Sequence, residues 1–328
     1  MKKTQIALAA VALVASSAAL AEVTVSGRID AGVQSGNSAS FSQRLGSGML
    51  APNFLNFSGS EDLGSGMKAI WMGRTAFSAA GFNSSTTGNS VTFLESYVGL
   101  SGDFGTLKLG QQFDAFGLGV LGFDVSGGSN MGSAVTPLFA HKNSAIFTDN
   151  AIGYAAPAIG PINASATYIV NDSAGTATGM TPKKGDYSLF GTADLGMVKL
   201  GAGYAVLNTN KSVAVTAGSD LGFGQLNLIY MDSNNVAGSN SGDKASTTGI
   251  NGKAPLVGGL ALAAGYYSTN GSVINGTNTI ATLLYSLSKQ TTVFGNYEKA
   301  TGAVILNAGG AAGGTTGEVV SLGVAHSF

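Results

Sequence analysis

The chain has no cysteine, only two histidines and few charged residues, and each shortage excludes a class of protein. Without cysteine, neither disulfide bonds nor thiolate metal sites can stabilise the fold. His141 and His326 are far apart in the sequence, which gives no support to a transition-metal site or a serine-type triad. His141 with Asp149 is the only candidate catalytic pair, and a structural or solvated loop histidine is the simpler interpretation. We therefore expect no metal, no cofactor and no enzymatic activity.

Charged residues make up 10% of the chain, against about 25% in ordinary globular proteins. Mean hydropathy is positive, at +0.25. After residue 21, however, no apolar run is long enough for a transmembrane helix. The apolar residues must therefore be dispersed, and alternation with a period of two disperses them. The formal net charge of −1 does not suggest a nucleic-acid partner.

The first 21 residues have the three parts of a secretory signal peptide in the usual order. Lys2 and Lys3 precede an apolar run over 6–14, and Ala19-Leu20-Ala21 is a small-x-small cleavage site. The apolar run is too short to span a bilayer as an anchor. We predict that residues 1–21 are a signal peptide and that residues 22–328 form the mature chain.

Apolar and polar residues alternate in short segments throughout the mature chain. The pattern is clear over 23–33, 162–170, 198–206 and 259–268. One apolar face and one polar or glycine face suits a strand between lipid and water, although a soluble β-sandwich alternates in the same way. Tyrosines near the predicted strand ends favour the membrane interpretation, because membrane barrels carry aromatic girdles. These tyrosines are Tyr168, Tyr204, Tyr230 and Tyr266.

Turn residues divide the chain into sixteen predicted antiparallel strands. They are 23–33, 53–61, 67–77, 91–101, 105–112, 149–156, 162–170, 186–194, 197–206, 212–220, 224–232, 246–254, 259–268, 279–287, 291–298 and 318–328, of which 246–254 has the weakest pattern. Short connectors recur as Asp-x-Gly turns at 62–64, 103–105, 194–196 and 220–222, while other connectors are longer and rich in Ser, Asn, Thr and Gly. Short turns on one rim and long loops on the other are typical of an outer-membrane β-barrel with both termini on the periplasmic side.

The connector at about 113–148 is much longer than the others, so we expect it to be functional. In a wide barrel such a loop can fold inward and narrow the lumen; the alternative is a disordered external loop. Residues 117–122 match the dinucleotide-binding pattern GxGxxG, but they precede no plausible helix or ribose-binding acid, so we interpret the match as chance.

Three motifs and the C-terminus resemble the general porins of Gram-negative β-proteobacteria. Residues 57–69, FSGSEDLGSGMKA, resemble their RGSEDLGGGLKA hairpin, and residues 97–110, YVGLSGDFGTLKLG, resemble their YVGLSGNFGTVTLG hairpin. Residues 149–154, DNAIGY, match their DNSVxY strand, and His326-Ser327-Phe328 is similar to their terminal H-x-F. The resemblance covers the whole chain in layout and the first half in detail. It implies an all-β, sixteen-stranded, trimeric transmembrane barrel with a third loop folded into the pore.

The resemblance also implies a function and partners. The protein would form a water-filled channel in the outer membrane for passive diffusion of ions and small hydrophilic solutes. Its partners would be two further copies of the chain, outer-membrane lipid and lipopolysaccharide, and the assembly machinery, with Phe328 as the assembly signal. A substrate-selective pore, or a barrel whose loops bind a ligand or partner, is the alternative. A sugar-selective pore would line its path with aromatics, whereas the inward positions here are mostly Ser, Thr, Asn and Gly, apart from Phe54 and Phe294.

Charged residues at the narrowest point set a pore's selectivity. Family members carry arginines facing the third loop, and those positions are here Phe54, Ser58, Leu94 and Gln111. Arg74, in turn, stands where the family tends to have an acidic residue. The wall should therefore be less basic than in related proteins, and anion preference does not carry over directly.

Our candidates for the constriction are Arg28, Arg74 and Lys108 on the barrel wall, and Asp114 and Asp124 on the long loop. The strand cations Lys68 and Lys199 share the inward register. Each candidate has a simpler interpretation: the arginines as solvated or paired lumen side chains, the lysine as a periplasmic rim residue, and the aspartates as caps of turns.

Glu95 is difficult to place from the sequence. Counting from Tyr97 puts it on the outward face, where lipid would not tolerate a charge. A subunit interface, the loop rim or an unrecognised bulge are the possible explanations.

Overall fold

The computed structural model describes residues 22–38, 41–80, 92–125, 137–138, 141, 146–172, 182–236, 242–302 and 317–328. Residues 1–21 lie outside this set, so the signal peptide remains a prediction. Among the residues described, no helix is both long and apolar enough to cross a membrane.

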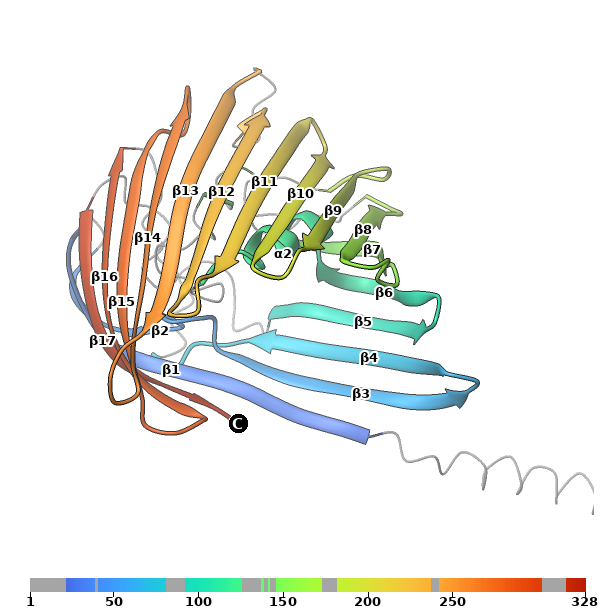
Figure 1. Ribbon diagram of the computed structural model, residues 1–328, viewed down its shortest axis with the longest axis horizontal. Coiled ribbons are helices and arrows are strands. Elements are labelled where there is room, and N and C mark those ends of the chain that lie inside the picture. The colour runs from blue at the N-terminus through green and yellow to red at the C-terminus, as the bar shows by residue number, and fades with distance from the viewer. Residues whose placement is uncertain are drawn as a thin grey trace, which may run out of the picture.

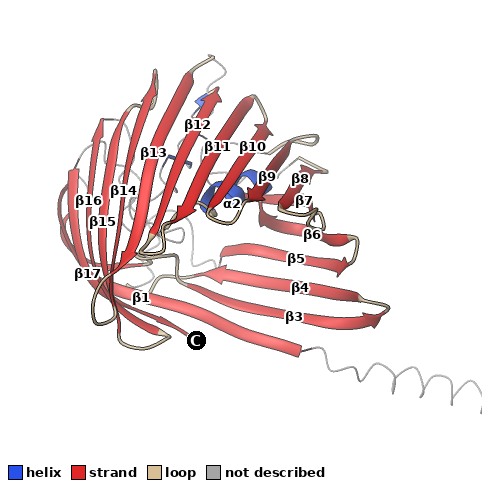
Figure 2. Cartoon of the chain, in the orientation of Figure 1, coloured by secondary structure: helices blue, strands red, loops and turns tan. Residues whose placement is uncertain are grey.

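The described chain forms one antiparallel sheet of seventeen strands (Figures 1 and 2). The strands are β1 (Glu22–Ser38), β2 (Phe41–Ser47), β3 (Phe54–Gly64), β4 (Met67–Ala76), β5 (Thr92–Gly102), β6 (Gly105–Phe113), β7 (Phe147–Ala155), β8 (Ile162–Ile169), β9 (Tyr187–Asp194), β10 (Val198–Leu207), β11 (Asn210–Asp220), β12 (Gln225–Asn234), β13 (Lys244–Pro255), β14 (Leu260–Gly271), β15 (Gly276–Ser286), β16 (Thr291–Gly302) and β17 (Gly317–Ser327). Helix α2 (Ala115–Leu121) follows β6. All sixteen predicted strands are present, including the weakest one, which is β13. Only β2 was not predicted.

The sheet closes on itself through β1. One edge of β1 pairs with β17, from Arg28↔Ser327 to Gly36↔Val319. Its other edge pairs first with β3 and then, from Ala31 onward, with β2. Strand β2 therefore continues the line of β3, and the ring has sixteen positions, as predicted. Closure gives each wall strand a partner on both sides, which is what a strand in hydrocarbon requires.

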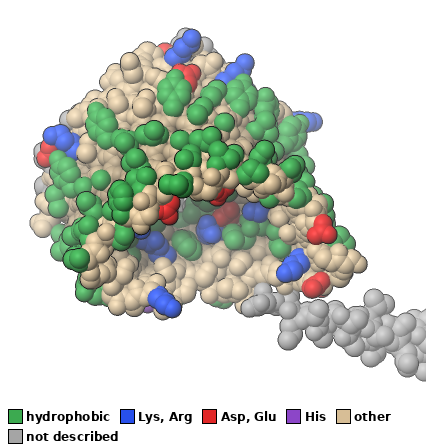
Figure 3. All heavy atoms as spheres, in the orientation of Figure 1, with side chains coloured by type: hydrophobic (Ala, Val, Ile, Leu, Met, Phe, Trp, Pro, Cys, Tyr) green, Lys and Arg blue, Asp and Glu red, His purple; other side chains and the backbone are tan. Residues whose placement is uncertain are grey.

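The alternating pattern separates a lipid face from a lumen face. On β17, Leu322 is 65% exposed and points outward, whereas the preceding Ser321 is 1% exposed and points into the barrel. Figure 3 shows hydrophobic side chains covering much of the outer surface, while charged side chains gather in the hollow between the walls. An apolar exterior around a polar lumen is the arrangement of a membrane barrel.

Three of the four predicted Asp-x-Gly turns show the expected side-chain hydrogen bond. The carboxylate of Asp62 accepts a hydrogen bond from the Gly64 amide at 2.8 Å, and Asp194 and Asp220 accept the same bond from Gly196 and Gly222. The three glycines have φ between +78° and +87°, which an L-residue rarely adopts. These short turns join β3 to β4, β9 to β10 and β11 to β12 on the rim that carries both chain ends.

Candidate pore constriction

The third loop enters the barrel through α2. The carboxylate of Asp114 caps the helix by accepting a hydrogen bond from the Gly117 amide at 3.0 Å. The next two amides bind the lumen-facing wall: Ala115 N donates to Thr167 Oγ1 on β8 at 3.0 Å, and Phe116 N donates to Ser188 Oγ on β9 at 3.4 Å. The prediction that this loop folds inward is confirmed, and Figure 1 shows α2 against the inner side of the ring.

Aromatic packing holds α2 close to the wall. The fully buried Phe116 ring meets the Phe190 ring of β9 edge-on, with centroids 6.5 Å apart. Gly119 passes so near Phe190 that a Cβ atom placed on it would lie 2.1 Å from the ring. Gly119, the second glycine of the apparent dinucleotide motif, is thus required by packing, because only a residue without a side chain fits there.

The described residues beyond α2 continue across the inner face of the barrel. The Asn251 side chain on β13 donates to Phe123 O and accepts from Val125 N, both at 3.1 Å. The ammonium of Lys199, on β10, lies 5.3 Å from the centroid of the Phe123 ring. The described residues of the loop therefore contact the wall from β8 to β13.

His141 is a second anchor of the loop. Its ring is fully buried, with Nδ1 2.8 Å from Ser233 Oγ on β12 and Nε2 2.8 Å from Thr247 Oγ1 on β13. Its carbonyl also accepts a hydrogen bond from Asn210 Nδ2 at 2.9 Å. These contacts give His141 a structural role, in place of the catalytic pairing with Asp149 that we considered.

Acidification should loosen this anchor. Burial lowers the pKa of His141 to about 4, whereas an undocked loop would protonate near the ordinary value of about 6.5. As the pH falls between these values, the undocked state gains protons and the docked state does not, so docking weakens by roughly 1.4 kcal/mol per pH unit. We expect larger current fluctuations in bilayer recordings at pH 4.5 than at pH 7. His141→Gln should abolish that difference, and an equal pH dependence in the variant would contradict the assignment.

The basic candidates lie on other strands of the wall. Arg28 on β1, Arg74 on β4 and Lys108 on β6 all face the lumen. Arg74 Nη1 lies 2.8 Å from Glu95 Oε2, and its guanidinium lies 4.9 Å from the centroid of the Phe54 ring. Lys108 Nζ lies 4.6 Å from the centroid of the Tyr97 ring. Arg28 lies near enough to Asp30 for an electrostatic attraction between the two side chains.

The outward placement of Glu95 was wrong. Tyr97 faces the lumen, while Val98 and Leu100 are the exposed, outward residues of β5. Glu95 therefore points inward as well, where it is 6% exposed and paired with Arg74. A register shift between Arg74 and Thr75, directly opposite, accompanies the pair. Glu95 consequently provides no argument for a subunit interface.

The acidic candidates Asp114 and Asp124 lie at the two ends of α2 in the third loop. Asp114 is 1% exposed because it caps α2, a placement that favours the capping interpretation. Asp124 borders a polar hollow of about 270 Å³ that is also lined by Lys199, Asp194 and Asp220. This hollow lies between the end of α2 and the short turns of β9–β12.

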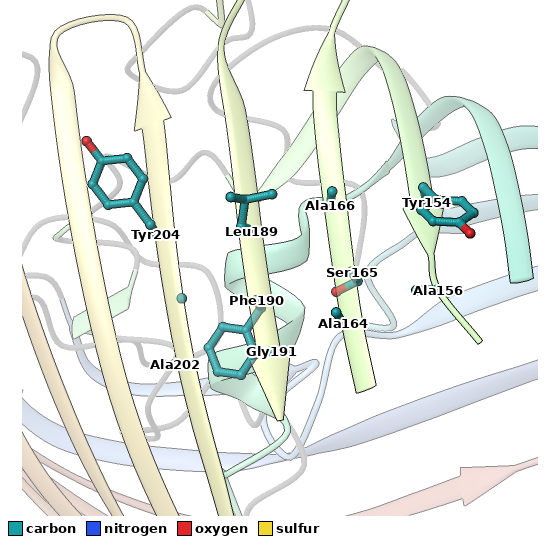
Figure 4. A pocket seen from close by; sticks show the side chains of 11 residues that line it. Tyr154, Ala156, Ala164, Ser165, Ala166, Leu189, Phe190, Gly191, Ala202 and Tyr204 are labelled. Carbon is teal, nitrogen blue, oxygen red and sulfur yellow. The ribbon is translucent and has the colours of Figure 1, made fainter. Parts of the chain in front are cut away.

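A further depression, of about 600 Å³, lies on the outer surface of β7–β10. Figure 4 shows Tyr154, Leu189 and Tyr204 around small residues such as Ala164 and Ala202. Because these positions are on the lipid face, the depression is not part of the lumen.

A sequence model of Gram-negative porins matches residues 7–302. The chain belongs to this porin family. It is therefore an outer-membrane protein, and the predicted resemblance is confirmed. The family also confirms that the protein is a channel-type barrel rather than an enzyme.

Individual relatives agree with this assignment. The porin is 27% identical to outer membrane porin protein 32 of Delftia acidovorans over the full length of both chains. It is 40% identical to major outer membrane protein P.IB of Neisseria gonorrhoeae over 117 residues, which are 34% of this chain and 32% of that protein. The match thus spans about a third of the Neisseria protein.

Solved structures share the fold. The anion-selective porin from Comamonas acidovorans aligns with a TM-score of 0.78 at 23% identity, covering 94% of this porin and all of that chain. The trimer form of OmpT from Vibrio cholerae aligns with a TM-score of 0.69 at 14% identity, covering 94% of this porin and 99% of that chain.

Proposed function

We propose that the protein forms a water-filled channel for passive diffusion of ions and small hydrophilic solutes. The observation that carries this proposal is the closed ring with a polar lumen, narrowed by α2 on one wall and faced by Arg28, Arg74 and Lys108 on the other. Charged side chains around a narrow aqueous passage act on solutes that cross it.

The lumen favours general diffusion over recognition of one sugar. Sugar-selective paths need exposed aromatic faces, but the inward rings of Phe190, Tyr267 and Phe294 are at most 4% exposed. Phe54 lies against Arg74. The rings of Phe190, Tyr267 and Phe294 thus pack within the protein rather than along the passage.

Planar-bilayer recording of the purified protein tests the channel directly. We expect single-channel steps whose conductance rises nearly in proportion to bulk salt, and swelling of proteoliposomes in small sugars that declines with sugar size. No conductance from protein that shows barrel circular dichroism would reject the proposal. Saturation of conductance by one sugar at low concentration would favour a selective pore instead.

We propose that three copies assemble through their outer walls, in contact with outer-membrane lipid and lipopolysaccharide. Support comes from the family and from the trimer form of a solved structure with this fold. We expect unheated electrophoresis to show an oligomer that boiling converts to a monomer band. A single species with the mass of one mature chain by light scattering in mild detergent would contradict the proposal.

We also propose that Phe328 serves as the assembly signal. Its amide and carbonyl bond to Gly27 at 3.0 and 2.9 Å, and its ring lies over Gly27, where a Cβ atom would be 2.4 Å from the ring. The last residue thus joins the first strand, a position at which assembly factors would meet the edge of the unclosed sheet.

Arg28 and Arg74 should set much of the positive wall potential. Replacing both with glutamine would leave Asp30 and Glu95 unbalanced in the lumen. We therefore expect the reversal potential in a salt gradient to shift toward cation preference. A double variant with the wild-type reversal potential would place the selectivity-determining charges elsewhere.

A further inference from the structure

A six-residue segment interrupts the line of β2 and β3 and turns into the barrel. On β1, only Ile29 and Asp30 separate the residue paired with the end of β2 from the residue paired with the start of β3. On the opposite side, residues 48–53 fill that interval. We call residues 48–53 the inward bulge. Six residues opposite two cannot all stay in the sheet, so the segment turns out of it. The turn begins at Gly48, which has a φ of +66°.

Asp30 holds the inward bulge in place. Its carboxylate accepts hydrogen bonds from three consecutive amides: Met49 at 2.7 Å, Leu50 at 3.0 Å and Ala51 at 3.2 Å. Its own amide donates to Asn53 Oδ1 at 2.7 Å, and its carbonyl accepts from Asn53 Nδ2 at 3.2 Å. Asp30 is fully buried beneath these contacts. Charge-assisted hydrogen bonds of this kind are about twice as strong as neutral ones.

Apolar packing determines where the bulge lies. Met49 is fully buried in a cluster with Ile280, Phe294, Ala300, Val319 and Ala325. All five belong to the lumen faces of β15–β17. Leu50 packs at the margin of this cluster and is half-buried. The bulge therefore covers the inner wall at β1 and β15–β17, whereas the third loop covers it from β8 to β13.

We propose that the inward bulge is a second constricting element of the pore and that Asp30 is its positioning residue. This inference rests on the proposed channel function. The third loop and the bulge then narrow the passage from two sides. Arg28, the next lumen-facing residue along β1, pairs with Phe54, the residue that directly follows the bulge.

A single thiol tests whether the bulge borders the passage. Because the chain has no cysteine, Leu50→Cys introduces a unique one. Its thiolate would displace methanesulfinate from a cationic methanethiosulfonate and retain the cationic group as a mixed disulfide. We expect conductance to fall by roughly a third or more when the full-length trimer is treated during recording. Leu322→Cys, on the lipid face, should show no change, and Thr24→Cys, on the lumen face of β1, should confirm entry of the reagent by mass spectrometry.

A second variant tests the role of Asp30. Asp30→Asn retains the shape but replaces one acceptor with a donor that faces the three amides. On the Leu50→Cys background we expect the modification rate to rise several-fold, and the unmodified conductance to rise by about 1.5-fold as the bulge detaches. Met49→Ala should act in the same direction by weakening the packing. Unheated electrophoresis identifies any variant that has lost its barrel.

The outcomes separate the two proposals. If the wild-type protein does not conduct, the channel function fails. If it conducts, and Leu50→Cys is either fully modified without a change in conductance or remains unmodified while Thr24→Cys reacts, the bulge does not border the passage. An Asp30→Asn barrel with unchanged conductance and modification rate would overturn the role of Asp30.

Discussion

Replacing Gly119 with leucine should lower single-channel conductance by roughly threefold, because conductance follows the area of the narrowest section. Gly119 faces Phe190 with no room for a Cβ atom. A leucine there must move α2 off the β9 wall and toward the lumen. Leucine favours helix over glycine by about 0.8 kcal/mol, so the helix itself should persist.

Two companion variants make this prediction specific. Adding Phe190→Ala to Gly119→Leu gives the leucine space and should restore most of the conductance. Deleting residues 115–121 should have the opposite effect and raise conductance above wild type. Equal conductance of Gly119→Leu and the wild-type porin, with the same trimer stability, would show that α2 does not limit the current.

Arg74→Gln and Glu95→Gln should shift the reversal potential in opposite directions. The two side chains form an ion pair of 2.8 Å in the lumen wall, and removing either leaves the other unbalanced. Arg74→Gln should favour cations and Glu95→Gln should favour anions, whereas the double variant should lie near the wild type. Shifts of the same sign would show that the pair does not face the passage.

The same variants should show a coupled effect on stability. The side chain of Glu95 is 8% exposed and that of Arg74 is 25% exposed. Each single variant therefore leaves a largely buried charge without its partner. We expect a cost on the order of 2–3 kcal/mol for each single variant, and much less for the double variant, whose glutamines can hydrogen-bond to each other. The temperature at which the trimer dissociates on electrophoresis measures this. Additive losses would argue against a direct pair.

Much of the fold follows from local patterns. The strands are recognisable because a wall between lipid and water imposes a period of two on every segment, and the turns because Asp and Gly have specific backbone roles. The inward third loop was predicted from its length together with the porin resemblance, because length alone also allowed a disordered external loop. The lumen register of Arg28, Arg74 and Lys108 followed from the same alternation.

The inward bulge and the true register of Glu95 were not predictable in this way. Asp30 looks like any polar residue on the lumen face, and its partners at 49–51 lie about twenty positions along the chain. Strand β2 was not recognised in the sequence because the stretch Gly46-Ser47-Gly48 breaks the alternation of apolar and polar residues. For β5, the error came from the assumption that Tyr97 faces lipid, whereas its ring lies beside Lys108 in the lumen. Contacts between distant segments decide these features, and a single sequence does not display them.

The seam between β1 and β17 also constrains how the protein folds. Gln34 and Ser321, hydrogen-bonded across it, are 287 positions apart, so this pairing has an exceptionally high contact order. Closing a flexible loop of that length costs about 5 kcal/mol in chain entropy. Until the seam forms, both edges expose unpaired amides and carbonyls to hydrocarbon, which penalises every partly closed intermediate. Barrel closure should therefore be the last and most cooperative step of insertion, and it requires a chain that is complete to its final residue.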